Sequence, residues 1–541
     1  MKKLFFALML LPLSAYGQRS DGELQKQIDI FVNLYRTLDM FYVDTLAADT
    51  AVRWAIDGML GKVDPFTVYY PNDDDEELMQ ITRGKYAGIG ALIRWNRKHK
   101  RAQIAEPYED TPSHKAGLRA GDILLSIDGR DIYNKMTAEV TKMLRGEAGT
   151  TFSVSVLRGK DTLDVSLTRR SIQLPVIPYS GLLPDSVGYI SLTGFVEGTA
   201  VEMRRTVMSL MDMGMKSLVL DLRSNPGGSL EEAIDILSLF LPKGSLVVSR
   251  KGKMPSACGD MFTRTQPIVP ETLPVAVLVN SASASAAEIV SGTLQDMDRA
   301  VVVGQRTYGK GLVQSIRDMP EGGSLKITTS RYYIPSGRCI QAYDYRHLNP
   351  DGSVGTVPDS LTRVFRTAAG REVRDGGGIK PDVVVTPDSL PTLVFDIVES
   401  DVMFDFATDY AASHPIIARP GEFEISDEDY QAFVDYVVAN DFKYNRRSDE
   451  VLKTLRQIAR IEGYLESAQD EFDALERKLN PEPSVDLMRN RREIARYLAD
   501  EIVTRYYYRS GSVRQMLVGD KDYDTAVGLL RDGSYKTILG K

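Results

Sequence analysis

Between residues 187 and 304 the sequence alternates short apolar runs with stretches long enough to form helices. Runs rich in Val, Ile and Leu are typical of strands that are buried on both faces of a sheet. The runs are residues 188–192, 217–221, 275–279 and 300–303, and the helical stretches are residues 197–213, 229–241 and 286–297. The alternation predicts an α/β domain built on a mostly buried parallel or mixed sheet.

The segments on either side of this region follow other patterns. Short strand-like runs separated by turn signals predict a compact β-rich module before it. Apolar residues at helical spacing predict helices near the N-terminus and one long helix over residues 452–479. A chain of 541 residues is expected to hold several domains. We expect a signal peptide at residues 1–17 and a helical region at residues 18–80. The β-rich module should follow at residues 81–172, the α/β core at residues 173–389 and a C-terminal helical domain at residues 390–541.

The first residues are typical of a secretory signal peptide. Lys2 and Lys3 precede the mostly apolar segment 4–16, and the small residues Ala15 and Gly17 suit a cleavage site. As a helix this segment would span about 20 Å, too short for a hydrocarbon core of ~30 Å. No later segment is apolar enough to span a membrane. We therefore expect a protein that is exported, periplasmic or otherwise, and soluble once the signal peptide is removed.

Composition excludes several classes of protein. The chain has 66 Lys and Arg against 74 Asp and Glu, a net charge of −8, which argues against a nucleic-acid partner. With four histidines and two cysteines, neither a disulfide scaffold nor a zinc module is expected. We expect no metal and no organic cofactor. The sequence leaves open whether Cys258 and Cys339 pair and whether the mature chain forms a homo-oligomer.

Three loops that follow predicted strands carry candidate catalytic groups. Gly227 and Gly228 precede a helix, where exposed backbone N–H groups can bind a developing oxyanion. Ser281, Ser283 and Ser285 lie where a strand leads into a helix, a position that exposes a nucleophilic hydroxyl. Lys310 lies between two glycines, with Gln314 four residues later. Lysine can serve as the base for a serine when burial keeps its amine neutral.

Each feature also has an ordinary structural explanation. Gly-Gly is common in turns. Ser285 followed by Glu288 fits a helix-capping box, and a lone lysine in a glycine turn is usually solvated. The four histidines lie in no motif that would pair one of them with a serine. The residues alone therefore favour lysine as the base but leave a histidine base and a purely structural role open.

Segments 221–228, 281–288 and 309–314 together resemble the catalytic set of the C-terminal processing peptidases, also called tail-specific proteases. The resemblance extends over about residues 30–385. It implies a multidomain α/β plus β-rich protein with a crotonase/ClpP-like protease core. By this resemblance Ser285 is the nucleophile, and Lys310 is the general base oriented by Gln314. The implied oxyanion donors are the backbone amides of Gly227 or Gly228, and of Ala286.

Gly88-Ile89-Gly90, followed by segments 111–122 and 127–129, is similar to a PDZ domain. In PDZ domains the backbone amides of such a loop take the terminal carboxylate of a peptide, which adds to the sheet as a strand. The resemblance therefore implies that Gly88, Ile89 and Gly90 bind peptides.

We expect an exported serine endopeptidase with a Ser-Lys dyad, whose partners are polypeptides with free C-termini. One alternative is a catalytically inactive peptide-binding PDZ scaffold. A second is an acyl-thioester enzyme, because related α/β folds support that chemistry. The intact Ser285, Lys310 and Gln314 argue against the scaffold, and no phosphate loop is present to support a nucleotide-type ligand.

Overall fold

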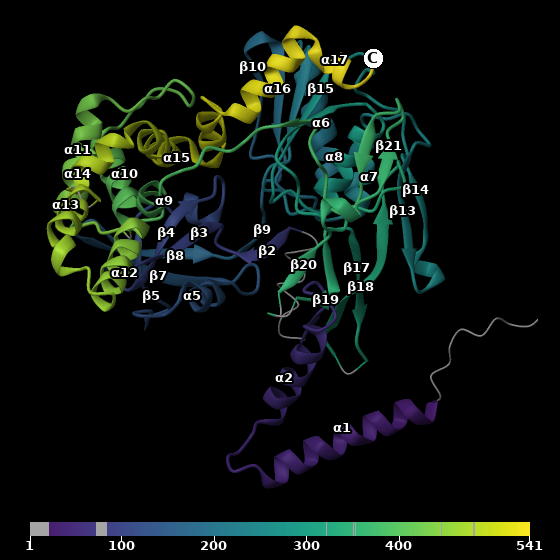
Figure 1. The fold of residues 1–541 in the computed structure, drawn as a ribbon, viewed down its shortest axis with the longest axis horizontal. Coiled ribbons are helices and arrows are strands. Elements are labelled where there is room, and N and C mark those ends of the chain that lie inside the picture. Colours follow the sequence, from purple (N-terminus) through teal and green to yellow (C-terminus); the bar gives the residue numbers. More distant parts are fainter. Residues whose placement is uncertain are drawn as a thin grey trace, which may run out of the picture.

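The computed structural model describes residues 21–71, 84–320, 322–349, 351, 353–444, 446–479 and 482–541. The signal peptide predicted over residues 1–17 lies outside these residues. Figure 1 shows the α/β core on the right, the β-rich module with most of the C-terminal helices on the left, and the first two helices extending below.

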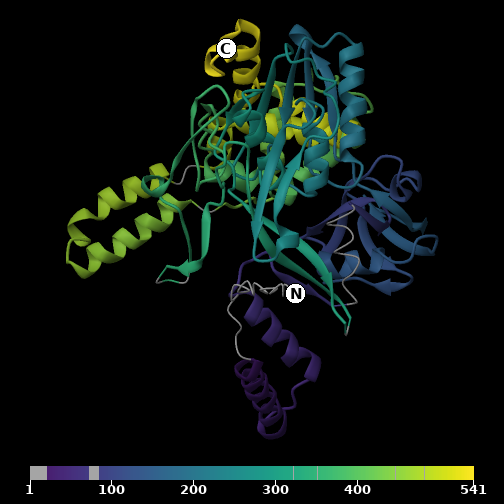
Figure 2. The same cartoon turned by 90° about the vertical axis from the view of Figure 1, so that its right-hand side faces the viewer.

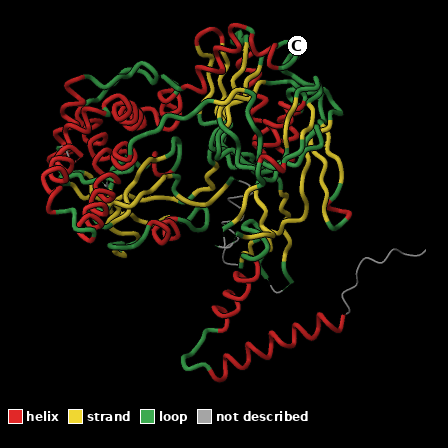
Figure 3. The backbone as a smooth tube through the Cα atoms, viewed as in Figure 1, coloured by secondary structure: helices red, strands yellow, loops and turns green. Residues whose placement is uncertain are grey.

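A six-stranded sheet forms the centre of the core (Figures 1 and 3). Its order is β10-β11-β12-β15-β16-β23, parallel except for β10 at one edge. The strands are β10 (Tyr179–Leu183), β11 (Val187–Ser191), β12 (Ser217–Asp221), β15 (Val275–Val279), β16 (Val301–Gly304) and β23 (Val383–Val384). The four apolar runs of the sequence form its central strands, so the predicted sheet is confirmed.

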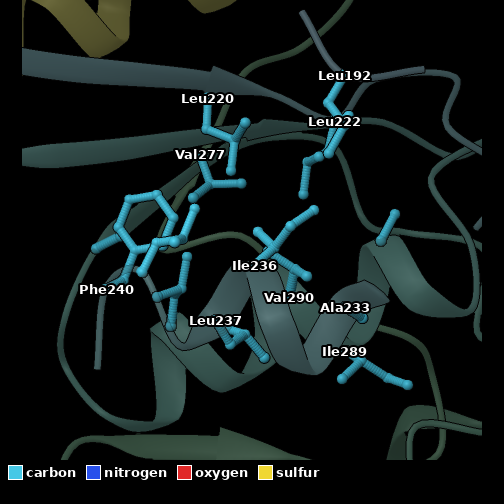
Figure 4. Close-up of a cluster of buried hydrophobic side chains, with 14 of the residues drawn as sticks. Leu192, Leu220, Leu222, Ala233, Ile236, Leu237, Phe240, Val277, Ile289 and Val290 are labelled. Atoms are coloured by element: carbon cyan, nitrogen blue, oxygen red, sulfur yellow. The ribbon is translucent and has the colours of Figure 1, made fainter. Parts of the chain in front are cut away.

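Three helices cover one face of this sheet: α6 (Thr199–Asp212), α7 (Leu230–Leu237) and α8 (Ala286–Asp296). Figure 4 shows Ile236 and Leu237 of α7 and Val290 of α8 packed against Leu220 and Val277 of the strands. Every residue of α8 is buried, which fixes its N-terminal end rigidly against the sheet.

The opposite face is covered by a helix from the far end of the chain. Ala526 and Leu530 of α16 (Lys521–Asp532) pack against Val219 and Leu278 of the sheet. The short α17 (Ser534–Ile538) follows it. The sequence assigns these residues to a C-terminal helical domain, but they complete the core, because both faces of a parallel sheet must be buried.

A second sheet with the order β1-β18-β13-β14 lies beside the first, and β17 pairs with β18. Its strands are β1 (Val68–Tyr70), β13 (Leu246–Gly252), β14 (Gly259–Phe262), β17 (Leu312–Asp318) and β18 (Ser324–Tyr333). Two short hairpins complete the core, β19 (Tyr343–Leu348) with β20 (Val354–Thr356) and β21 (Val364–Arg366) with β22 (Glu372–Arg374). Through β1, the N-terminal region becomes part of the core.

The β-rich module is a curved antiparallel sheet with the order β3-β4-β5-β7-β8, and β6 pairs with β5. The elements are β3 (Ala91–Asn96), β4 (Arg101–Pro107), α4 (Pro112–Lys115), β5 (Ile123–Ile127), β6 (Arg130–Asp131), α5 (Thr137–Leu144), β7 (Thr151–Arg158) and β8 (Asp161–Thr168). Strands β2 (Lys85–Gly88) and β9 (Arg170–Gln173) pair where the chain enters and leaves the module. The module is thus inserted into the chain through a two-stranded stem.

Helices α1 (Asp21–Phe41) and α2 (Ala48–Leu60) form the predicted N-terminal helical region and project from the body (Figure 2). The C-terminal helices are α9 (Thr392–Val398), α10 (Asp401–Ser413), α11 (Asp427–Ala439), α12 (Arg447–Ile461), α13 (Gln469–Leu479), α14 (Pro483–Arg489) and α15 (Arg491–Met516). Among the described residues, no helix combines the length and apolar character needed to cross a membrane.

The single long helix predicted over residues 452–479 is wrong. The chain leaves the helical path at Gly463, whose φ is +81°, and returns as a helical hairpin of α12 and α13. Glycine adopts this left-handed conformation without the steric cost that a Cβ would add, and it commonly ends helices. The apolar residues that repeat at helical spacing over residues 452–479 therefore belong to two helices, α12 and α13, which pack against each other.

The module is docked on the C-terminal helices. Arg94 of β3 forms an ion pair with Asp401 at 3.1 Å. Tyr508, at a kink within α15, has its hydroxyl 3.0 Å from His114 Nε2, and the Arg509 N–H donates to Glu106 at 2.9 Å. The helices therefore fix the position of the module.

Candidate active site

The three candidate loops meet at one edge of the central sheet. They follow β12, β15 and β16, whose carboxyl ends lie together because the strands are parallel. The Ala284 N–H donates to the Asn225 carbonyl at 2.9 Å, and the Tyr308 N–H donates to the Ser283 carbonyl at 3.0 Å. Backbone hydrogen bonds thus join the first loop to the second and the second to the third.

Ser285 begins α8 in a strained backbone conformation. Its φ of 54° and ψ of −114° lie outside the common regions for residues with a side chain, and such strain is concentrated at functional sites. The neighbouring Ser283 is fully buried, and its hydroxyl donates to the Leu222 carbonyl at 2.7 Å. Ser281 is exposed. Of the three serines in this loop, Ser285 has the setting of a nucleophile.

The fully buried carboxylate of Glu288 joins the serine loop to the lysine loop. One oxygen accepts the backbone N–H groups of Ser285 at 2.9 Å and Lys310 at 2.8 Å. The other accepts the Thr307 hydroxyl at 2.5 Å and the Gly309 N–H at 2.7 Å. Burial raises the pKa of Glu288, while these four donors favour its charged form. Glu288 therefore does more than cap a helix.

Tyr332 makes a second connection between the same two residues. Its hydroxyl lies 2.6 Å from the Lys310 carbonyl oxygen and 3.2 Å from the Ser285 carbonyl oxygen. The backbones of Ser285 and Lys310 are therefore held together on two sides, by a carboxylate and by a phenol.

The Lys310 side chain is half-buried, and its amine lies 4.3 Å from the centroid of the Phe66 ring. Within the described part of the chain this amine makes no hydrogen bond or ion pair. Burial and the positive charge of Lys326 lower the pKa of Lys310 to about 8, against the opposing effect of Glu288 and Asp64. A lysine that is partly neutral near pH 8 can act as a base.

Among the described residues Gln314 makes no hydrogen bond to Lys310, so its predicted orienting role stays a prediction. Its side-chain amide instead donates to the Thr328 hydroxyl at 3.1 Å. Gln314 and Thr328 are direct partners across the β17–β18 pair, so the Thr328 hydroxyl lies opposite the glutamine and can accept its hydrogen bond.

The Gly-Gly turn lies directly against Ser285. A Cβ added to Gly227, whose φ is +97°, would come within 2.8 Å of the Ser285 Cβ and of the Ala286 nitrogen. The N–H of Gly227 donates to the Asn225 side chain at 2.9 Å and is therefore occupied. Among the described residues, the N–H groups of Gly228 and Ala286 have no acceptor. Of the predicted oxyanion donors, these two remain available.

The predicted peptide-binding loop borders a groove of about 340 Å³ in the β-rich module. Gly88 and Ile89 line it together with β3, an edge strand of the sheet, and α5. The Gly90 carbonyl points into the module, where it accepts the Tyr108 N–H at 2.8 Å and the Ser113 hydroxyl at 2.7 Å. The groove therefore has an unpaired strand edge and a loop suited to an extended peptide.

Cys258 and Cys339 are both free thiols. Within the part of the chain that the structure describes, no group of three or more His, Cys, Asp or Glu residues is arranged to hold a metal ion.

Comparison with known proteins identifies the family. “Peptidase family S41” matches residues 186–359, “PDZ domain” matches residues 103–158, and “Probable PDZ-protease, C-terminal helical domain” matches residues 393–530. The “Carboxy-terminal-processing protease” of Bartonella bacilliformis is 34% identical over 341 residues, which are 62% of this chain and 77% of that relative. The chain belongs to the carboxy-terminal-processing proteases.

The chain is also similar to other known proteins. The “Probable CtpA-like serine protease” of a Staphylococcus epidermidis strain is 30% identical over 340 residues, 61% of this chain and 67% of that relative. A solved structure of a photosystem II D1 C-terminal processing protease is 24% identical, covers 69% of this chain and 95% of its own, and has a TM-score of 0.35. As a carboxy-terminal-processing protease, the chain is a serine-type peptidase with an embedded PDZ domain. The expected fold class is confirmed.

Three residues at this site escaped the sequence analysis. The first is Glu288: its spacing from Ser285 was visible in the sequence, but it indicated only a helix cap. Tyr332 and Phe66 carried no signal, because each reaches the loops from a distant strand or turn. Their roles depend on long-range packing.

Proposed function

We propose that this carboxy-terminal-processing protease is an exported serine endopeptidase with a Ser285–Lys310 dyad, which engages polypeptides near their C-termini through its PDZ domain. The observation that carries the proposal is the shared Glu288 oxygen. It accepts backbone N–H groups from both Ser285 and Lys310, so the proposed nucleophile and base lie beside each other. The lowered pKa of Lys310 supports its role as a base.

The mechanism follows from the chemistry of these groups. Neutral Lys310 accepts the hydroxyl proton of Ser285, whose oxygen forms a bond to the scissile carbonyl carbon. The backbone N–H groups of Gly228 and Ala286 bind the resulting oxyanion. As the carbon–nitrogen bond breaks, the Lys310 ammonium protonates the departing amine. Water, deprotonated by the same lysine, then releases the acyl group as a carboxylate.

This mechanism requires a hydrogen bond between the Ser285 hydroxyl and the Lys310 amine, which is not formed among the described residues. The backbone of Lys310 is held by Glu288 and Tyr332, so the amine would reach the hydroxyl by rotation about the lysine side-chain bonds. Gln314 would exchange its bond to Thr328 for one to the amine if it orients the base.

Activity is expected to rise with pH until Lys310 is neutral. Because the pKa of Lys310 is about 8, the protonated, inactive form dominates below that pH and the neutral form above it. A plot of log kcat/KM against pH should have a slope near one on the acid side and level off above about pH 8. A profile that levels off near pH 6 would instead indicate a histidine base.

Recognition of a free C-terminus predicts that amidated peptides bind more weakly. A charge-assisted hydrogen bond contributes about 1.5–3 kcal/mol, so amidation should weaken binding roughly ten- to a hundredfold. Binding of the acid and amide forms of one peptide to the Ser285→Ala protein can be compared by calorimetry. Equal affinities for the acid and the amide would show that the PDZ domain does not recognise a free C-terminus. The domain would then serve as a spacer.

The inactive-scaffold alternative gains no support from the site. A scaffold would have no need for a strained serine whose loop shares a buried carboxylate with a lysine of lowered pKa. Cleavage of an unfolded polypeptide by the purified mature protein, absent with Ser285→Ala, is the direct test of the proposed activity.

A further inference from the structure

The Phe66 ring that covers Lys310 belongs to a segment far from the peptidase core in sequence. It lies in the turn between α2 and β1, within the N-terminal region. Phe66 is half-buried, and its ring also contacts Tyr345 edge-on at 5.8 Å between centroids. The ring therefore has a fixed position at the pocket and is not a surface side chain that happens to lie near a lysine.

The turn that carries Phe66 is built around one buried carboxylate. Asp64 accepts the backbone N–H groups of Phe66 and Thr67, each at 2.8 Å, and the Thr67 hydroxyl at 3.1 Å. Such local side-chain bonds to the backbone hold a turn in one shape. The orientation of the Phe66 ring is therefore set by residues 64–67 themselves.

The same turn reaches the proposed orienting glutamine. The Thr67 hydroxyl accepts the Thr328 N–H at 3.3 Å, and the Thr328 hydroxyl accepts the Gln314 amide at 3.1 Å. Strand β1, which follows the turn, pairs with β18 beside these residues. One turn is thus connected both to the lysine and to the residue expected to orient it.

A ring over an amine favours the charged form. The face of an aromatic ring attracts an ammonium group, by about 0.5–2 kcal/mol depending on burial, and has little attraction for a neutral amine. The other charged groups that act on Lys310 are Lys326 of β18, Glu288 of α8 and Asp64 of the turn. The positive charge of Lys326 disfavours the ammonium form of Lys310, and the carboxylates of Glu288 and Asp64 favour it.

We propose that Phe66 is a positioning residue for Lys310: its ring binds the ammonium form, which makes no hydrogen bond to Ser285 in the described structure, and releases the amine when it becomes neutral. This inference rests on the proposed function, in which Lys310 is the base. It gives the N-terminal turn a part in the pH dependence of cleavage. The ring delays deprotonation in the free enzyme, and the lysine returns to it when it is protonated between turnovers.

The test measures the pKa of Lys310 directly by competitive labelling. The full-length mature protein is treated with trace acetic anhydride over a range of pH, and acetylation of the Lys310 peptide is measured by mass spectrometry. Phe66→Leu keeps an apolar cover but removes the ring, so the midpoint should fall by about 0.4–1.5 units from its wild-type position. Phe66→Tyr keeps the ring and should match the wild type.

Phe66→Met provides a second aliphatic variant in case Phe66→Leu folds poorly, and it should shift the midpoint in the same direction. The acid limb of the kcat/KM profile should move to lower pH together with the labelling midpoint. A midpoint that is unchanged or higher in both aliphatic variants would overturn the inference.

The role of Lys310 as the base and the role of Phe66 can be tested separately. Labelling reports the pKa of Lys310 whether or not that lysine is the base. If Lys310→Arg retained normal cleavage, the proposed function would fall, whatever the labelling showed. If Lys310→Arg were inactive and the aliphatic variants left the labelling curve unchanged, the role of Phe66 alone would fall.

Discussion

Ser285→Ala is expected to abolish proteolysis, with kcat/KM lower by at least about a thousandfold. The substitution removes the oxygen that forms the acyl-enzyme and leaves the pocket otherwise intact. The strained backbone and the bond from the Ser285 N–H to Glu288 do not depend on the hydroxyl. We expect the free energy of unfolding to fall by at most about 2 kcal/mol, the largest cost of losing a helix cap. Cleavage assays and urea unfolding measure the two quantities.

Ser281→Ala is the matched control, because Ser281 lies in the same loop and is exposed. It should cleave like the wild type. Ser283 is the rival nucleophile in sequence, but its hydroxyl is already engaged with the Leu222 carbonyl. Retained cleavage by Ser285→Ala, together with its loss in Ser283→Ala, would transfer the assignment to Ser283.

Lys310→Arg should be nearly inactive although it keeps the positive charge. A guanidinium does not lose its proton at working pH, so the variant has no base to take the Ser285 proton. General base catalysis contributes about a hundred- to ten-thousandfold, and a loss of that order is expected in kcat. KM should change much less, because the lysine acts on the serine rather than on the bound peptide.

Lys326→Arg is the corresponding control. Lys326 is a neighbouring lysine whose amine donates to the Tyr70 hydroxyl at 3.3 Å, and its charge is one of the influences on Lys310. The substitution keeps that charge, so turnover and its pH profile should stay close to the wild type. Near-normal turnover in Lys310→Arg, measured over the same pH range, would rule out lysine as the base.

The sequence predicts the core well because its signals there are local. Strands β12 and β15 coincide with the apolar runs 217–221 and 275–279, since a strand buried on both faces needs continuous apolar residues. That the loops of Ser285 and Lys310 meet could be expected for a related reason. Each lies in a glycine- or alanine-rich loop directly after such a strand, and parallel strands bring those loops to one edge.

The remainder depended on contacts between distant parts of the chain. No local pattern indicates that α16 covers the second face of the sheet, or that Phe66 lies over Lys310. No local pattern indicates that the Gln314 amide donates to Thr328, which lies directly opposite on β18, instead of to Lys310. Only the break at Gly463 was signalled locally, by a glycine within the apolar repeat.

The central claim is that Lys310 activates Ser285, and labelling with a fluorophosphonate tests it most directly. Such reagents phosphonylate activated serines, because the serine oxygen bonds to phosphorus as fluoride leaves, and they require no knowledge of the physiological substrate. We predict one adduct, mapped by mass spectrometry to Ser285, which forms faster as the pH rises through about 8 and is lost in Lys310→Arg. An adduct on Ser281 or Ser283, or equal labelling of Ser285 in Lys310→Arg, would contradict the account.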